Sequence, residues 1–233
     1  MSVDILAFAA HPDDVELTMG GTMLRLKQQG YSTGIIDFTR GELSTKGTVE
    51  TRQKETDDAS EILQLDVREN LNLGDGIFKE NEENRQRIMD CIRKYTPKII
   101  FAPYKTDRHP DHERCSRMVR EAHFYSGLKH YKTNYSHYRA NHLYYYMANT
   151  VFEPSFIFDV TDTFEGRIQL IKAYKSQFFN PEKKDDEVTP ISRPEFLEYI
   201  RARARFYGEK SGVLYGEAFY TESIPRYTDF PEL

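Results

Sequence analysis

Cysteine, surplus positive charge and long apolar runs are all scarce in this sequence, and each shortage excludes a class of protein. The two cysteines, Cys91 and Cys115, have no CxxC spacing. We therefore interpret them as buried or half-buried thiols rather than as a disulfide or a redox motif. The formal net charge is -5, which argues against nucleic acid as a partner.

The longest apolar stretch near the N-terminus covers residues 3–10, contains Asp4 and has no basic segment before it. It is too short and wrongly flanked for a signal peptide or a membrane helix. We therefore expect a cytoplasmic protein with no membrane partner.

The composition is typical of a folded, water-soluble chain, with 39% hydrophobic and 30% charged residues. A chain of 233 residues can bury one continuous hydrophobic core. We predict a single domain over residues 1–233. It has a regular half over 1–130 and a less regular continuation over 131–233.

Short apolar runs alternate with longer helical patterns through the regular half. Strands are expected over residues 4–10, 32–38, 69–73 and 98–102, and helices over a segment ending near Gly30, over 48–65, over 84–95 and over 111–128. This alternation predicts an α/β fold, a Rossmann-like three-layer α/β/α arrangement with a mainly parallel sheet and right-handed crossovers.

The continuation has a weaker pattern. Strands are expected over residues 142–147, 155–160 and 218–221, and helices over 164–175 and 194–207. The charged segment 180–193 is interpreted as a solvated surface loop, with a mobile lid as the alternative.

Two polar segments follow predicted buried strands at the point where each strand ends. The first is HPDDVE over residues 11–16, after the first strand, and the second is HPDH over residues 109–112, after the fourth. In a sheet with strand order 3-2-1-4 these strands are neighbours at the switch point, where such folds bind ligands. The two segments are therefore expected to meet in one crevice.

Three residues of these segments form a candidate metal site. His11 and Asp14 have the spacing that places two side chains on one face of a first helical turn. His112 can supply a third ligand, and two imidazoles with one carboxylate and an open position are typical of a catalytic zinc site. Iron, cobalt or manganese would also accept these ligands.

The neighbouring residues suggest the rest of the chemistry. Asp13 is adjacent to a ligand but cannot share its direction, so it is the candidate general base for hydrolysis of an amide. His109 is expected to stabilise the oxyanion as an imidazolium, with Asp111 orienting that ring. A lone His-Pro-Asp is more often a turn or a helix cap, but the joint placement of both segments favours a metal site.

The runs AHPDDVE and HPDH resemble the two motifs of the LmbE-like, or PIG-L, family of zinc-dependent N-acetylglucosaminyl deacetylases. Residues 39–55 (TRGELSTKGTVETRQKE) and 174–178 (YKSQF) resemble the bacterial branch that deacetylates N-acetylglucosaminyl malate in bacillithiol biosynthesis. The resemblance covers nearly the whole chain. It implies the same metal ligands and general base as the residues themselves suggest, and the same role for His109.

The resemblance also implies substrate contacts and an assembly. Arg52 and Arg108 would help to bind the substrate, which suits a malate aglycone because guanidinium groups match carboxylates. By the same analogy Glu42 would bind sugar hydroxyls. Proteins of this branch are often hexamers, so a homo-oligomer is expected. Thr18 stands where the branch usually has glycine, so helix packing or substrate fit next to the site could differ from that of the branch.

Three other functions remain open at this stage. The substrate could be another N-acetylated sugar, such as a chitooligosaccharide, an inositol conjugate or an antibiotic precursor. A dinucleotide-binding oxidoreductase would need a G-x-G-x-x-G turn after the first strand, where this chain has His-Pro-Asp-Asp, and Gly20-Gly21 comes too late. A sugar-binding protein without activity would have no need of Asp13.

Overall fold

A computed structural model describes residues 2–178 and 187–224 of the chain. In this part seven strands form one sheet in the order β3-β2-β1-β4-β5-β7-β6. The strands are β1 (Ile5–Ala9), β2 (Thr33–Asp37), β3 (Val67–Asn70), β4 (Ile99–Pro103), β5 (His142–Tyr146), β6 (Phe156–Asp159) and β7 (Gly216–Tyr220). Strands β1 to β5 are parallel to one another, whereas β7 is antiparallel to both β5 and β6.

Six α-helices and two short 3-10 helices connect these strands. They are α1 (Asp14–Gln28), α2 (Val49–Leu63), α3 (Glu82–Tyr95), α4 (Pro110–Ser126), α5 (Phe164–Ala173), α6 (Phe196–Lys210), η1 (Thr161–Thr163) and η2 (Pro190–Ser192). Within the described residues, no helix combines the length and the apolar character that crossing a membrane would require.

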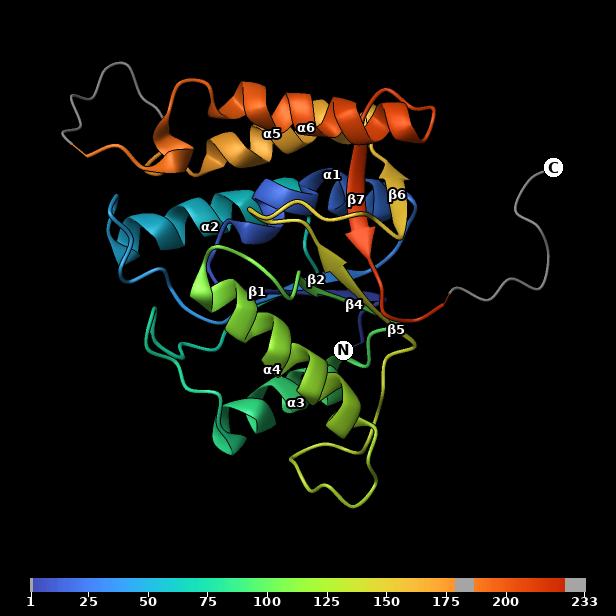
Figure 1. Cartoon of the computed structure of the whole chain (residues 1–233). Helices are drawn as coiled ribbons and strands as arrows, with labels where there is room; N and C mark the ends of the chain where they lie inside the picture. Colours follow the sequence, from blue (N-terminus) through green and yellow to red (C-terminus); the bar gives the residue numbers. More distant parts are fainter. Residues whose placement is uncertain (1, 179–186, 225–233) are drawn as a thin grey trace.

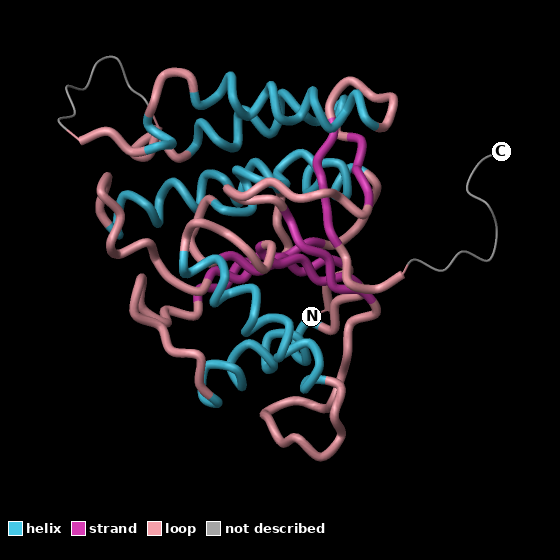
Figure 2. The backbone as a smooth tube through the Cα atoms, viewed as in Figure 1, coloured by secondary structure: helices cyan, strands magenta, loops and turns pink. Residues whose placement is uncertain are grey.

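The helices lie on both faces of the sheet, as the alternating pattern predicts. In Figure 1, α3 and α4 cover one face and α1 and α2 cover the other. Figure 2 shows the strands as a band between these two sets of helices. Strand β1 is buried along its whole length because it contributes side chains to both faces: Leu6 and Phe8 pack toward α3 and α4, and Ile5 and Ala7 pack toward α1. The α/β prediction with a mainly parallel sheet is confirmed.

A further layer lies outside the three that the sequence predicts. Helices α5 and α6 pack on each other through Phe164, Ile168, Ile200 and Ala204, and α5 covers α1. Figure 1 shows this pair above α1 and α2. The C-terminal part of the chain therefore extends the sheet with β5, β7 and β6 and adds a second helical layer over α1.

The third strand is shifted from its predicted position. It covers Val67–Asn70 rather than residues 69–73. It includes Arg68, a charged residue that pairs with the buried carboxylates of Glu16 and Asp37. A charged residue in a four-residue strand hides the apolar pattern on which the prediction depends.

The predicted loop over 180–193 can be compared only in part, because residues 179–186 lie outside the described residues. The described remainder contains η2, where the Thr189 side chain accepts a hydrogen bond from Ser192 N–H at 3.2 Å. Thr189, Pro190 and Ile191 line a large cavity.

Candidate active site

The two polar segments meet because β1 and β4 are hydrogen-bonded neighbours, as the order 3-2-1-4 predicts. His11, Asp13 and Asp14 follow β1, and His109 and His112 follow β4. All five line one cavity of about 880 Å³. This volume is in the upper part of the range of roughly 300–1,000 Å³ found for small-molecule sites.

A tight turn connects β1 to α1. The backbone N–H of His11 donates to Oδ2 of Asp14 at 2.9 Å, which fixes the first ligand against the start of the helix. Between them Asp13 has a φ of 119°, a conformation that residues other than glycine rarely adopt and that costs about 1–3 kcal/mol. The turn therefore stores strain at the residue that the sequence suggests as the general base.

The second segment is held by the start of α4. Pro110 occupies the first turn and His109 is the N-cap residue, whose Nδ1 accepts a hydrogen bond from the N–H of Asp111 at 3.3 Å. Nδ1 of His112 lies 3.1 Å from Oδ1 of Asp107, while its Nε2 lies 3.2 Å from Oδ1 of Asp14. Asp107 thus orients the ring of His112 and leaves Nε2 facing the first segment.

His11, Asp14 and His112 fit a divalent metal. Their candidate ligand atoms all lie within 4.8 Å of one another. Two imidazoles and a carboxylate form the donor set expected of a catalytic zinc site. A metal-binding histidine is often hydrogen-bonded through its other ring nitrogen to a carboxylate, and Asp107 makes this contact with His112.

The charges around the cluster also favour a cation. Burial lowers the pKa of His11, but hydrogen bonds to Asp111, Asp14 and Asp75 outweigh burial and raise this pKa well above its usual value. Burial likewise opposes the charged form of His112, and Asp14 and Asp107 raise its pKa to about 9. The carboxylates therefore stabilise positive charge at this cluster, and a divalent ion held by the two rings in their deprotonated form would supply the same charge.

Asp13 lies beside this cluster and is paired with a buried arginine. Burial raises the pKa of Asp13 to about 7, although the charge of Arg52 acts in the opposite direction. Nη1 of Arg52 lies 2.8 Å from Oδ2 of Asp13 and donates to the carbonyl of Pro12 at 2.6 Å. A carboxylate whose pKa is near neutrality can accept a proton and return it.

His109 faces the cavity with the geometry of a neutral hydrogen-bond donor. Its Nδ1 accepts from a backbone N–H, so the ring proton is assigned to Nε2. Burial and the neighbouring His11 and His112 lower the pKa of His109. This direction favours a neutral ring over the imidazolium that the sequence suggests, although the charges of Asp14 and Asp111 act in the opposite direction.

The carboxylate of Asp111 binds groups other than the ring of His109. It accepts from the N–H of Gly76 and from Arg114, both at 2.8 Å, and its Oδ2 lies 3.7 Å from Nε2 of His11. Asp111 is 1% exposed and is not among the described residues that line the cavity. The contact of Asp111 with His109 is made by its backbone N–H and not by its carboxylate.

The three residues with implied substrate contacts differ in their positions. Arg108 lines the cavity and makes no hydrogen bond or ion pair with the described residues. Arg52 also lines the cavity, but it is 4% exposed and its Nη atoms are used by Asp13, Pro12 and Ser44. Glu42 is not among the described lining residues, and its carboxylate lies 3.6 Å from Nε of Arg40.

Asp75 and Asp107 are the site residues that sequence reasoning missed. Oδ1 of Asp75 lies 3.1 Å from Nε2 of His11, and Asp107 binds His112 and the side chain of Asn149. Some signal was present. Asp75 stands between two glycines after the third strand, and Asp107 comes two residues before His109. A carboxylate after a strand is common, however, and only the sheet order shows that both reach the cluster.

Comparison with known proteins identifies the family. Residues 6–123, slightly more than half of the chain, match the family model of PIG-L, described as GlcNAc-PI de-N-acetylase. The chain therefore belongs to the PIG-L family of deacetylases, and this part of the prediction is confirmed.

Several relatives match most of the chain. A conserved protein of Thermus thermophilus has a TM-score of 0.89 and 36% identity, with 99% of this chain and 100% of that chain covered. The N,N'-diacetylchitobiose deacetylase of Pyrococcus horikoshii has a TM-score of 0.80 and 27% identity, covering 92% and 82%. The diacetylchitobiose deacetylase of Thermococcus kodakarensis is 27% identical over 91% of this chain and 80% of that protein.

A protein of the malate branch matches less of the chain. The probable N-acetyl-alpha-D-glucosaminyl L-malate deacetylase 2 of Bacillus anthracis is 25% identical over 131 residues. The match covers 51% of this chain and 58% of that protein.

Proposed function

We propose that this protein is a zinc-dependent hydrolase that removes the acetyl group from an N-acetylglucosamine unit of a small saccharide such as diacetylchitobiose. The observation that carries the proposal is the cluster of His11, Asp14 and His112, with Asp13 beside it in one cavity. Bound zinc would polarise the acetyl carbonyl and lower the pKa of a nearby water.

The residues of the chain supply the proton transfers. Asp13 takes a proton from a water molecule as the oxygen of that water bonds to the carbonyl carbon of the acetamide. The Nε2–H of His109 donates a hydrogen bond to the carbonyl oxygen as negative charge collects there. Asp13 then delivers the proton to the nitrogen as the C–N bond breaks, so that acetate and an amine are formed. Arg52 holds Asp13 in place through both steps.

The size and lining of the cavity favour a substrate of two sugar units over a monosaccharide. At about 880 Å³ it extends from the metal cluster to α6, where Phe196 and Tyr199 line it. Aromatic rings offer flat apolar surfaces on which the C–H faces of a second sugar can pack. Two relatives that match most of the chain are described as diacetylchitobiose deacetylases.

A malate conjugate is the second candidate. Arg108 and Arg193 line the cavity, and their side chains make no hydrogen bond or ion pair with the described residues, so they could bind an anionic aglycone. Two points weaken this candidate. The guanidinium of Arg52 is already bound to Asp13, and the relative described as a malate deacetylase matches only about half of the chain.

A direct test measures acetate release by metal-stripped protein given back zinc, iron, cobalt or manganese in turn. The substrates are N,N'-diacetylchitobiose, N-acetylglucosaminyl malate and N-acetylglucosamine. We expect zinc to restore activity and kcat/KM to be highest for diacetylchitobiose. A higher kcat/KM for the malate conjugate would favour the malate conjugate as the substrate instead. No acetate release from any of the three substrates would refute the proposal.

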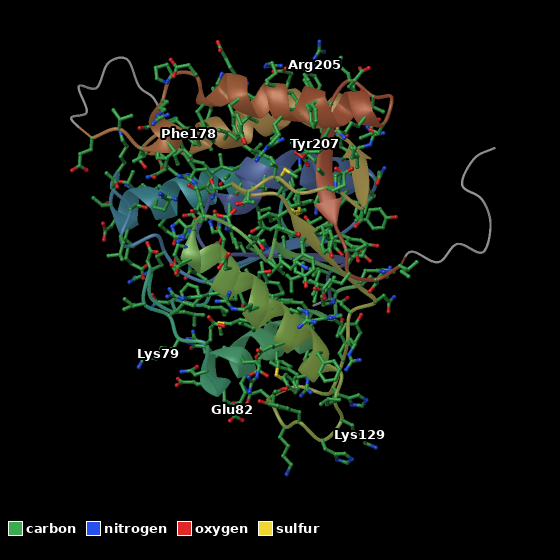
Figure 3. All side chains as sticks on the ribbon, viewed as in Figure 1. Lys79, Glu82, Lys129, Phe178, Arg205 and Tyr207 are labelled. Carbon is green, nitrogen blue, oxygen red and sulfur yellow. The ribbon has the colours of Figure 1, made fainter. Side chains whose placement is uncertain are left out.

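Two variants separate the candidates further. Tyr199→Ala should raise KM for diacetylchitobiose more than for the malate conjugate, and Arg108→Gln should do the reverse. Arg205→Gln is the matched control, because Arg205 lies on the outer side of α6 (Figure 3) and is not among the described lining residues. Equal effects of Tyr199→Ala on both substrates would contradict the second-sugar contact.

We also propose a homo-oligomer such as a hexamer, which rests on the resemblance to the malate branch. Light scattering on the purified protein tests this assembly, and a monomer at the protein concentration of the assay would refute it.

A further inference from the structure

Helix α1 is broken in the middle. Met19 has φ −136° and ψ 23°, which are not helical values, so the helix consists of two segments that meet at this residue. The first segment begins at Asp14 and carries Leu17 and Thr18, which line the cavity. The position of the first segment therefore sets the position of a proposed metal ligand and of one wall of the site.

A buried ion pair fills the break. In an uninterrupted helix the N–H of Gly21 would donate to the carbonyl of Leu17. Here Glu217 of β7 accepts from the N–H groups of Gly21 and Thr22, at 3.0 and 2.7 Å, and from the Thr22 hydroxyl at 2.5 Å. Arg167 of α5 donates to the carbonyl of Leu17, and its Nη1 lies 3.1 Å from Oε1 of Glu217.

The ion pair thus connects the two segments through both of its ends. Glu217 holds the start of the second segment, Arg167 holds the first, and each is joined to the other. Arg167 is 2% exposed and Glu217 is 3% exposed. Separating two buried charges is costly, so the pair favours one fixed arrangement of the two segments, although Nε of Arg167 has no hydrogen-bond partner among the described residues.

The Gly20-Gly21 pair makes room for these side chains. A Cβ atom on Gly21 would lie 2.9 Å from Oε1 of Glu217, and one on Gly20 would lie 3.3 Å from Cγ of Arg167. The two glycines therefore permit the close approach of α5 and β7 to the break. This gives a physical reason for a glycine pair inside a helix.

We propose that Arg167 and Glu217 are positioning residues that fix the first segment of α1, and through it Asp14, for metal binding and catalysis. The inference rests on the proposed function for its effect on turnover, but its effect on metal affinity can be measured without a substrate. Neither residue contacts the metal cluster in the described structure, so each acts only through the helix.

The test compares zinc affinity, turnover and thermal unfolding in three variants. Glu217→Ala removes the hydrogen bonds to the second segment and the ion pair with Arg167, and Glu217→Gln keeps a similar shape and one carbonyl acceptor. Ile92→Ala is the control, because Ile92 is a buried residue of α3 on the opposite face of the sheet and its truncation destabilises the core without touching α1. Zinc affinity is measured by competition with a chromogenic chelator.

We expect Glu217→Ala to weaken zinc binding by about 10- to 100-fold, the range found when groups that orient metal ligands are removed. Its kcat at saturating zinc should fall by at least about tenfold. Glu217→Gln should lie between the parent and Glu217→Ala, whereas Ile92→Ala should keep zinc affinity and kcat despite its lower unfolding temperature.

Two outcomes would overturn the proposal. One is a folded Glu217→Ala protein with zinc affinity and kcat within twofold of the parent, and the other is an equal loss of zinc affinity in Ile92→Ala. If Glu217→Ala does not fold, Gly21→Ala replaces it, since the new methyl group displaces Glu217 and should also weaken zinc binding. A parent that binds zinc but releases no acetate would refute the proposed function, while the order of zinc affinities would still decide this inference.

Discussion

Replacing Arg52 with methionine separates two roles for this residue. The resemblance to the malate branch implies that Arg52 binds substrate, whereas the structure shows its Nη atoms bound to Asp13, Pro12 and Ser44. If Arg52 acts through Asp13, the Arg52→Met variant should lower kcat for every substrate and change KM little. If Arg52 binds an anionic aglycone, it should raise KM for the malate conjugate alone.

The size of the effect follows from burial. Arg52 and Asp13 are 4% and 5% exposed, so removing one partner leaves an uncompensated buried charge and costs about 3–5 kcal/mol of stability. Burial already raises the pKa of Asp13 to about 7, and the charge of Arg52 lowers this pKa. Without Arg52 the pKa should rise further. Each pH unit below it reduces the deprotonated fraction about tenfold, and the deprotonated form is the active base.

The assay is a pH profile of kcat at saturating zinc for the parent and Arg52→Met, with Arg40→Met as an exposed control nearby. The acidic limb of the profile should move to higher pH in Arg52→Met, because the base must lose its proton. Bound zinc would lower the pKa of Asp13 in both proteins and leave the direction of this difference unchanged. An unmoved limb with a raised KM for the malate conjugate would refute the role in positioning Asp13.

The other predictions concern the metal cluster. Asp13→Asn should keep zinc and lose about 10²–10⁴ in kcat, and metal loss in this variant would contradict its assignment as the base. His112→Ala should lose both zinc and activity, as measured by metal content and acetate release. Asp107→Ala should weaken zinc binding about 10- to 100-fold because the ring of His112 loses its partner. Metal-free protein should unfold at lower temperature as the pH rises from 6.5 toward 9: the pKa of His112 is raised to about 9, so its stabilising contribution is complete below 6.5 and is lost above 9.

Much of the fold could be predicted because the core strands follow simple patterns. Strands β1, β2 and β4 lie within one or two residues of their predicted ends, since each is an apolar run between turn residues. With β3 they have the 3-2-1-4 order that was assumed because it is common in such sheets, and that order brings residues 11–14 and 109–112 together. The outer layer of α5 and α6 was not predicted, because helical periodicity shows that a helix has a buried face but not what covers it.

The parts of the site that could not be predicted depend on contacts between distant residues. Arg52 is a polar residue on a polar helix, and nothing in its local sequence shows that it turns inward to Asp13. Asp75, in the loop after β3, and Glu217, on β7, likewise reach partners that are distant in the sequence. A sequence pattern describes neighbours along one element, whereas these groups are brought together only when the sheet is assembled.

The departures from local rules themselves point to a functional site, independently of any resemblance. Asp13 has a positive φ where glycine would be unstrained, α1 breaks at Met19 a few residues later, and the candidate metal ligand Asp14 lies between these two positions. Such features cost stability, and proteins keep them mainly where function requires a fixed geometry. The costs are offset by buried arginines that bind backbone carbonyls: Arg52 holds Pro12 and Arg167 holds Leu17. The strained turn and the broken helix are therefore braced on either side of Asp14, which is the arrangement expected if the position of that carboxylate determines metal binding and turnover.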